Sequence, residues 1–127
     1  MNTDVSFIIS VDSSFEMTNN FFECLFADDF VKNSEVIVVL DSITNNSIIK
    51  YLKKLRTTNH NLKLYFQDKK LGYGKANNYA VKQSTNNILY FINTDVFAES
   101  DCFAKMHLAL MQSNVGCVQP LLIWPQN

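Results

Sequence analysis

The sequence predicts one α/β domain, built on a mostly parallel, Rossmann-like sheet with helices on both faces. Apolar runs typical of strands alternate with helical patterns along the whole chain. Such alternation implies βαβ units, which close right-handed and give parallel strands. The 127 residues, 47% of them hydrophobic, supply the core of a single domain spanning 1–127.

The first half of the chain contains three predicted strands and two predicted helices. Residues 5–11 (VSFIISV) and 35–40 (EVIVVL) are largely apolar and rich in β-branched side chains, so we expect buried strands there. Residues 62–66 (LKLYF) predict a third strand, less buried than the others. Helices are expected at 17–30 and 46–56. Their apolar residues recur at helical spacing, namely Phe22, Leu25, Phe26 and Phe30 in the first and Ile48, Leu52 and Leu55 in the second.

The second half continues the alternation. Residues 75–83 predict a short helix, and 88–92 predict a fourth strand that is buried on both faces. Ser100 is the expected N-cap of a further helix, after which 115–118 begin a fifth strand. The inward-facing positions of these two helices are Ala76, Tyr79 and Ala80 in the first and Phe103, Met106 and Leu110 in the second.

Charge and cysteine content argue against several classes of protein. The 11 Lys and Arg residues nearly balance the 12 Asp and Glu residues and are scattered, which argues against a dedicated nucleic-acid surface. Cys24, Cys102 and Cys117 have no CxxC spacing, so we expect reduced, mostly buried thiols and no disulfide or zinc site. No basic leader accompanies Asp4, and no apolar run is long enough to span a bilayer. We therefore expect a cytoplasmic protein, either free or peripheral to the membrane.

Polar side chains stand at the carboxyl end of every predicted strand. In parallel α/β sheets ligands bind beyond these ends, where the loops diverge. The residues to consider are Asp12 and Ser13 after the first strand, Asp41 and Ser42 after the second, the segment 72–78 after the third, and Asn93, Thr94 and Asp95 after the fourth.

Asp95 is the strongest candidate for a metal ligand. It ends the stretch NILYFINTD, in which an apolar strand pattern runs directly into a carboxylate. A single carboxylate beside other oxygen donors suits Mg²⁺, which keeps most of its water and takes further ligands from substrate phosphates. The alternative is that Asp95 only stabilises the turn before the next helix, since Asn and Asp favour turns.

The stretch KKLGYGKANNYAV at 69–81 carries Gly72 and Gly74 before a predicted helix. Glycines allow a loop to approach a ligand closely, and the amides at a helix start face an anion. It is no dinucleotide fingerprint, because Asn77 stands where GxGxxG needs glycine, and it lacks the GK[ST] of a P-loop. The alternative is a loop whose glycines only supply positive φ angles.

Taken together, these stretches resemble the N-terminal half of a family 2 glycosyltransferase with the GT-A fold. The matches occur in the family's order and spacing, and they cover the chain nearly from end to end. Asn93 stands in the place of the first Asp of the DxD motif, and in this the sequence resembles rhamnosyltransferase-like members. The matching stretches are SFIISVDSS (6–14), EVIVVLDSITNNS (35–47), LGYGKANNYAV (71–81), FINTDV (91–96) and VGCVQPLL (115–122).

The resemblance implies a metal-dependent, inverting transfer of a sugar from a nucleotide-diphosphate sugar to an acceptor hydroxyl in polysaccharide biosynthesis. Asp95 would bind Mg²⁺ or Mn²⁺ between the two phosphates, and a saccharide or lipid-linked saccharide would be the acceptor. Asp41 would lie against the nucleoside base. The other donor-binding positions implied are Ser10 and Asp12 at the base, Gly72, Gly74, Lys75 and Asn78 beside the donor, and Asn93 and Thr94 near the ribose or sugar.

Several residues depart from the family pattern. Leu40 replaces the first acid after the second strand, and Asp12 and Ser13 replace the usual Tyr and Asn, so base recognition is expected to differ. Ala80 replaces a frequent glycine on a helix, which is a mild change. Asn93 in the place of Asp removes one negative charge, which should weaken metal binding when no nucleotide is present.

The resemblance places the general base and the acceptor surface in a second half that this sequence does not contain. No residue is assigned as that base, and His107 fits a packing role better than a catalytic one. The chain is therefore expected to be incomplete at its C-terminal side, and the apolar stretch PLLIWP at 120–125 predicts self-association. The alternative is a non-catalytic nucleotide-binding or interaction module that retains the GT-A fold.

Overall fold

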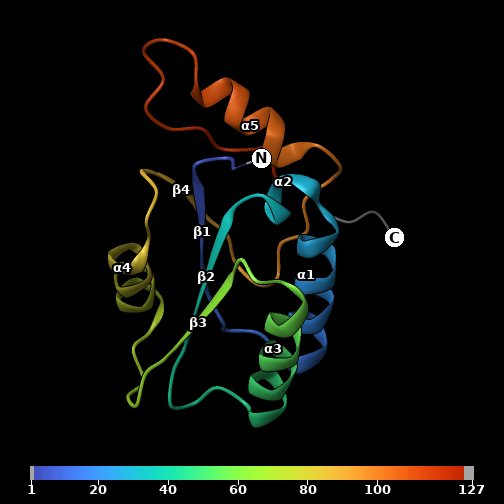
Figure 1. Ribbon diagram of the computed structural model, residues 1–127, viewed down its shortest axis with the longest axis vertical. Coiled ribbons are helices and arrows are strands. Elements are labelled where there is room, and N and C mark those ends of the chain that lie inside the picture. Colours follow the sequence, from blue (N-terminus) through green and yellow to red (C-terminus); the bar gives the residue numbers. More distant parts are fainter. Residues whose placement is uncertain (1, 125–127) are drawn as a thin grey trace.

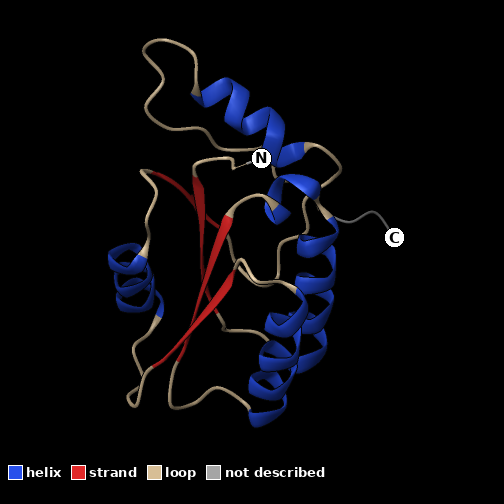
Figure 2. Cartoon of the chain, viewed as in Figure 1, coloured by secondary structure: helices blue, strands red, loops and turns tan. Residues whose placement is uncertain are grey.

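Four apolar runs form one parallel sheet in the computed structural model, which describes residues 2–124 (Figures 1 and 2). The strands lie in the order β3-β2-β1-β4, and all three pairings are parallel. The predicted fold class is confirmed. The strands are β1 Val5–Ser10, β2 Glu35–Leu40, β3 Leu62–Phe66 and β4 Ile88–Phe91.

Helices cover both faces of the sheet. Figure 1 shows α1 and α3 side by side on one face and α4 on the other, while α5 lies beside α2 near the edge where the strands begin. The helices are α1 Phe15–Ala27, α2 Asp29–Lys32, α3 Asn46–Thr58, α4 Tyr73–Gln83 and α5 Cys102–Leu110.

The two central strands carry the core. Every residue of β1 and β2 is buried, as expected for strands covered on both faces. Alternate side chains point to opposite faces, so Phe7 packs against Phe30 and Phe103 in one core cluster while Ile8 belongs to another with Ala76 and Ala80 of α4. The expected two-sided burial of the fourth strand is wrong: β4 is an edge strand in which only Tyr90 is buried.

Several predicted boundaries differ for local reasons. The predicted helix at 17–30 begins earlier, where the Ser14 hydroxyl accepts a hydrogen bond from the Met17 amide. It is interrupted at Asp28, whose extended backbone and carboxylate cap α2 through the Phe30 amide. Asp101, with φ 64°, precedes α5 in place of the predicted cap Ser100.

The fifth strand predicted at 115–118 does not form. Its four residues lie outside any strand, and three of them are exposed. Because α5 packs beside α2 and does not cross over the sheet, the chain that follows α5 is not brought alongside the free edge of β4 (Figure 1).

The expectation of mostly buried cysteines is also wrong. Cys24 and Cys117 are exposed and Cys102 is half-buried, and all three are free thiols. No helix within residues 2–124 has the length and apolar character needed to cross a membrane.

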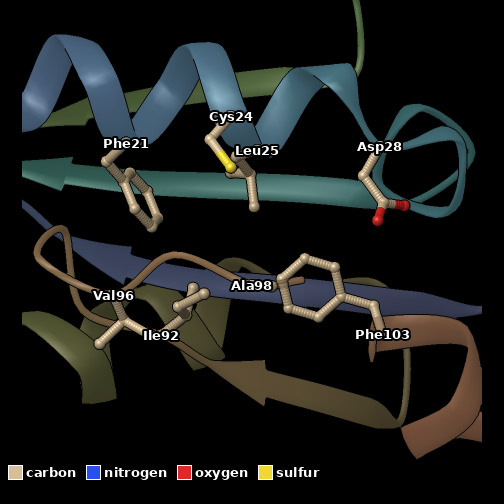
Figure 3. Close-up of a pocket in the computed structure, with 8 residues that line it drawn as sticks. All are labelled: Phe21, Cys24, Leu25, Asp28, Ile92, Val96, Ala98 and Phe103. Carbon is tan, nitrogen blue, oxygen red and sulfur yellow. The ribbon is translucent and has the colours of Figure 1, made fainter. Parts of the chain in front are cut away.

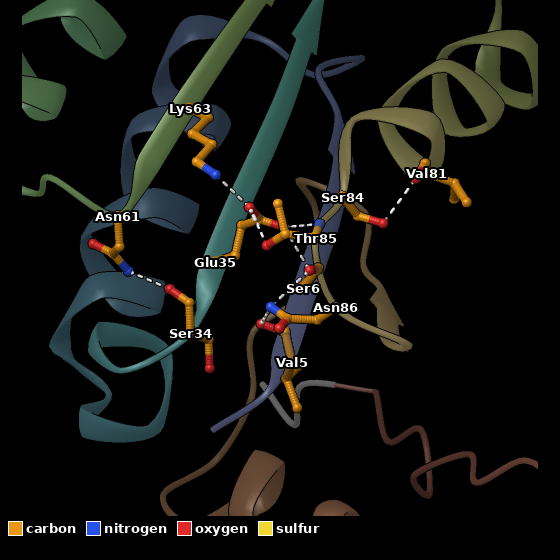
Figure 4. A network of polar contacts seen from close by, with 10 residues as sticks. All are labelled: Val5, Ser6, Ser34, Glu35, Asn61, Lys63, Val81, Ser84, Thr85 and Asn86. Carbon is orange, nitrogen blue, oxygen red and sulfur yellow. Dashed lines mark hydrogen bonds and ion pairs between the residues drawn. The ribbon is translucent and has the colours of Figure 1, made fainter. Parts of the chain in front are cut away.

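Glu35 organises the edge where the strands begin (Figure 4). Its carboxylate accepts hydrogen bonds from the Ser6 hydroxyl at 2.6 Å and from the amide and hydroxyl of Thr85 at 2.9 and 3.0 Å. Lys63 forms an ion pair with the same carboxylate. Asn86 adds bonds to the Ser6 hydroxyl and to the Val5 carbonyl oxygen. This buried carboxylate therefore joins β1, β2 and β3 to the segment that leads into β4.

The network determines the ionisation of Glu35. Burial alone would raise the pKa of this carboxyl, but the Lys63 ammonium and the hydrogen bonds from Ser6 and Thr85 outweigh burial and lower the pKa from 4.5 to about 2. The charged form is thus stabilised by folding. This contribution is present above the unfolded pKa of 4.5 and is lost as the pH falls toward 2.

Glu35→Gln should lower the free energy of unfolding by about 2 kcal/mol at pH 7, because an amide cannot accept all four bonds and leaves Lys63 unpaired. The difference from the wild type should shrink between pH 4.5 and pH 2. Urea denaturation across that range measures it, with the exposed Glu99→Gln as the matched control. A constant difference at every pH would contradict the assigned role of the carboxylate.

Candidate functional site

The carboxyl ends of the four strands meet at the edge opposite the Glu35 network. Ser10 pairs in register with Val39, and Leu40 pairs with Phe66, so the strands end at nearly the same level. The sequence-predicted residues after each strand therefore lie along one edge of the sheet.

The loop after β1 contributes one buried and one exposed group. Ser10 is only 8% exposed, and its Oγ has no hydrogen-bond partner among the described residues. Because side chains alternate along a strand, Ser10 shares the α4-facing side with Ile8. Asp12 is exposed. A hydroxyl left unpaired at the mouth of the sheet can bond to a polar ligand.

The loops after β1 and β4 are joined by two hydroxyls. Ser13 Oγ lies 2.7 Å from Thr94 Oγ1, and Thr94 is 2% exposed. The hydroxyl of Thr94 connects the two loops, and the predicted contact of Thr94 with the donor stays a prediction. Its neighbours Asn93 and Asp95 are exposed, and the Val96 amide donates to the Asn93 carbonyl oxygen at 3.3 Å, which closes a turn between them.

Apolar packing holds the loop after β4 in place (Figure 3). Ile92, Val96 and Ala98 face Phe21 and Leu25 of α1 across a narrow seam. The cavity left there measures about 10 Å³, which has room for at most one water molecule. The seam is therefore a packing contact that supports Asn93 and Asp95 and has no room for a ligand.

Asp41 connects the loop after β2 to the glycine loop. One carboxylate oxygen accepts from the Ile43 amide and the other from the Leu71 amide, both at 3.1 Å. The Asp41 amide donates to Thr44 Oγ1 at 3.1 Å, and the Thr44 amide donates to the Asp41 carbonyl oxygen at 3.1 Å. The side chain of Asp41 is thereby fixed from both sides.

The glycine loop opens directly into α4. Gly72 has φ 74° and ψ 170°, a conformation that strongly favours glycine, and it precedes the helix without a side-chain cap. A Cβ at Gly72 or Gly74 would meet nothing within 4 Å, so the loop is open on its outer side. The first-turn amides of α4 are therefore available to an anion.

Two neighbouring asparagines of α4 have opposite environments. Asn78, which was predicted to bind the donor, is exposed and lines with Lys75, Tyr79 and Lys82 a shallow hollow of about 310 Å³. Asn77 was overlooked: it is 8% exposed, and its Oδ1 has no partner within the described part of the chain. Its spacing of three residues from the buried Ala80 is the signal that would have placed it on the inner face.

The edge fits a divalent cation that arrives with phosphates better than a permanent metal centre. Within residues 2–124 no three His, Cys, Asp or Glu side chains converge on one point. Asp95 offers an exposed carboxylate with the Asn93 side chain close in sequence. Such a sparse set of oxygen donors suits Mg²⁺ or Mn²⁺ only when water and ligand phosphates complete the coordination.

Neither histidine lies at this edge. The ring of His107, on α5, packs against Phe30 with 5.5 Å between centroids. Helix α5 lies near the edge where the strands begin (Figure 1). This contact agrees with a packing role for His107. His60 is exposed in the turn before β3.

Solved structures of glycosyltransferases share this fold. A mannosyltransferase of Pyrobaculum calidifontis in complex with GDP-Man and Mn²⁺ matches 94% of this chain at 20% identity, with a TM-score of 0.79. S. aureus TarS 1–349 in complex with UDP-GlcNAc matches 87% at 24% identity, with a TM-score of 0.72. The chain spans 36% and 31% of the lengths of these two proteins.

Sequence comparison gives the family directly. No curated protein matches the chain. The family model described as Glycosyl transferase family 2 matches residues 6–125, which is nearly the whole sequence. This chain therefore belongs to glycosyl transferase family 2.

Proposed function

We propose that the chain is the donor-binding portion of a glycosyltransferase that transfers a sugar from a nucleotide-diphosphate sugar to an acceptor hydroxyl with inversion. One observation carries the proposal. The tie from Asp41 to Leu71 joins the loops after β2 and β3, and the tie from Ser13 to Thr94 joins the loops after β1 and β4, while Asp95 stays exposed. A structural role alone does not require a free carboxylate there.

The proposed site has two charged regions, one at Asp95 and one at the glycine loop. Asp95, with Asn93 beside it, would hold Mg²⁺ or Mn²⁺, and the cation would stabilise the negative charge of the departing nucleoside diphosphate. The first-turn amides of α4 and the Lys75 ammonium supply positive charge at the glycine loop. Ser10, Asp12 and the loop of Asp41 would surround the nucleoside.

We assign no residue of this chain as the general base or as a contact for the acceptor. The chain spans 36% and 31% of the lengths of the two similar structures, and we propose that the whole protein supplies these groups from other residues. The neighbours carry GDP-Man and UDP-GlcNAc, which makes guanosine and uridine nucleotides the first ligands to test. We propose the cytoplasm as the location.

The wild-type chain should bind at least one of UDP, GDP and dTDP in the presence of Mn²⁺, and much more weakly without it. Asp95→Ala should lower the metal-dependent affinity by about tenfold or more, because the cation loses the carboxylate proposed to bind it. Isothermal titration calorimetry measures both effects. Glu23→Ala, which removes an equal charge from the exposed side of α1, serves as the control.

Two results would count against the donor site. One is a folded wild-type chain that binds no nucleotide, which would favour the non-catalytic module. The other is an Asp95→Ala variant that binds with unchanged metal dependence.

Ser10→Ala separates a ligand contact from a structural one. Removing a buried, unpaired hydroxyl should leave the melting temperature unchanged or higher, because its burial costs about 1–3 kcal/mol. If the hydroxyl bonds to the nucleotide, affinity should fall about three- to tenfold. Thermal unfolding measures the melting temperature and calorimetry measures the nucleotide affinity of the same samples, with the exposed Ser100→Ala as control. Lower stability with unchanged affinity would assign Ser10 a structural role.

We also propose self-association through the apolar segment 121–124. Its side chains are exposed, in contrast to the apolar residues of the core. Light scattering at tens of micromolar should detect species larger than a monomer, and Leu122→Ser with Trp124→Ser should reduce them. A monodisperse wild-type monomer would contradict the proposal.

A further inference from the structure

We infer that Asp41 is a positioning residue that anchors the glycine loop and so aims the start of α4 at the donor. The inference rests on the proposed function, since it assigns a role within the same site. It differs from the role that family resemblance implies, which is direct contact with the nucleoside base.

The hydrogen bonds of Asp41 give it this role. Its carboxylate spans two loops that are 30 residues apart, with one oxygen bound to the Leu71 amide and the other to the Ile43 amide. Bonds between backbone N–H groups and an ionised carboxylate are among the stronger ones in proteins. Next to this contact, the Gln67 amide donates to the Leu40 carbonyl oxygen at 2.8 Å. The loop is thus tied to the end of β2 at both Gln67 and Leu71.

The second tie lies immediately before the turn that starts the helix. Leu71 precedes Gly72, whose left-handed conformation redirects the chain, and the Ala76 amide donates to the Gly72 carbonyl oxygen at 3.0 Å in the first helical turn. The Leu71 side chain also packs on the α4 side of the sheet. Fixing the Leu71 amide therefore fixes the direction of the first-turn amides of α4.

The same bonds hold the Asp41 carboxylate in one orientation, so a base could reach only the lone pairs that the two backbone amides leave unused. Both carboxylate oxygens already accept backbone N–H groups, and Leu40 beside it is apolar and buried. Neutral groups can also select the nucleoside, and among the described residues Ser10 Oγ and Asn77 Oδ1 are buried without partners. Oδ1 of Asn77 is an acceptor, so it favours a ring N–H or a sugar hydroxyl over a phosphate oxygen.

Limited trypsin digestion tests the anchor, because Lys69 and Lys70 lie directly before Leu71 and are exposed. Asp41→Asn loses one of the two acceptors and Asp41→Ala loses both, so cleavage at these lysines should be about tenfold faster than in the wild type. Mass spectrometry identifies the cleavage sites. Glu23→Gln, which removes an equal charge from the exposed side of α1, should cleave like the wild type.

Nucleotide affinity tests the consequence for the donor. Binding of UDP, CDP and GDP with Mn²⁺ should weaken by a similar factor in Asp41→Asn, because a misaimed helix start affects the shared diphosphate. A base contact would behave differently, since a carboxylate prefers the N3–H of uracil and an amide in its place would shift the preference toward cytosine. The ratio of UDP to CDP affinity is therefore decisive.

Each outcome either supports or overturns the inference. Faster cleavage together with a uniform loss of affinity supports it. Unchanged cleavage, or a changed UDP to CDP ratio, overturns it. If the wild-type chain binds nucleotide and both Asp41 variants bind equally well, only this inference fails. If the wild-type chain binds none of UDP, CDP, GDP and dTDP, the proposed function fails and takes the inference with it.

Discussion

Parallel pairing of β1 with both β2 and β4 is the constraint on which the rest of the molecule depends. Because these strands point the same way, each connection must cross over the sheet, and the crossovers supply the helices that bury the two central strands. The same geometry puts all strand beginnings at one edge and all strand ends at the other. The residues that stabilise the strand beginnings are thereby separated in space from the proposed site at the strand ends.

The two edges use polar residues in opposite ways. At the beginning edge the Glu35 carboxylate is saturated by Ser6, Lys63 and Thr85, which leaves nothing for a ligand. At the ending edge, hydrogen bonds join the loops and other groups stay available: Asp95 is exposed, and Ser10 Oγ has no partner among residues 2–124. A buried hydroxyl without a partner among the described residues costs stability, so the place of Ser10 Oγ at this edge is more consistent with binding than with folding.

The strand and helix order was predictable because each element carries its own periodicity, from the β-branched run of β2 to the apolar stripe of α3. Contacts between residues far apart in the sequence were not predictable. Glu35 could be read from sequence only as the start of a strand, since its partners lie 28 to 50 residues away. The absent strand at 115–118 has the same cause, because the position of α5 beside α2 is a tertiary contact that no local pattern encodes. Asn77 and Asn78 differ only in which face of α4 they occupy, and helical spacing would have separated them.

The most direct test of the donor site is amide NMR of the wild-type chain with nucleotide and Mn²⁺, because the paramagnetic ion broadens resonances near it. The account predicts that broadening is centred on Asp95, extends to Ser13 and Gly72, and leaves Thr85 at the opposite edge sharp. Broadening centred elsewhere, or none when nucleotide is present, would contradict a metal-assisted donor site at the carboxyl ends of the strands.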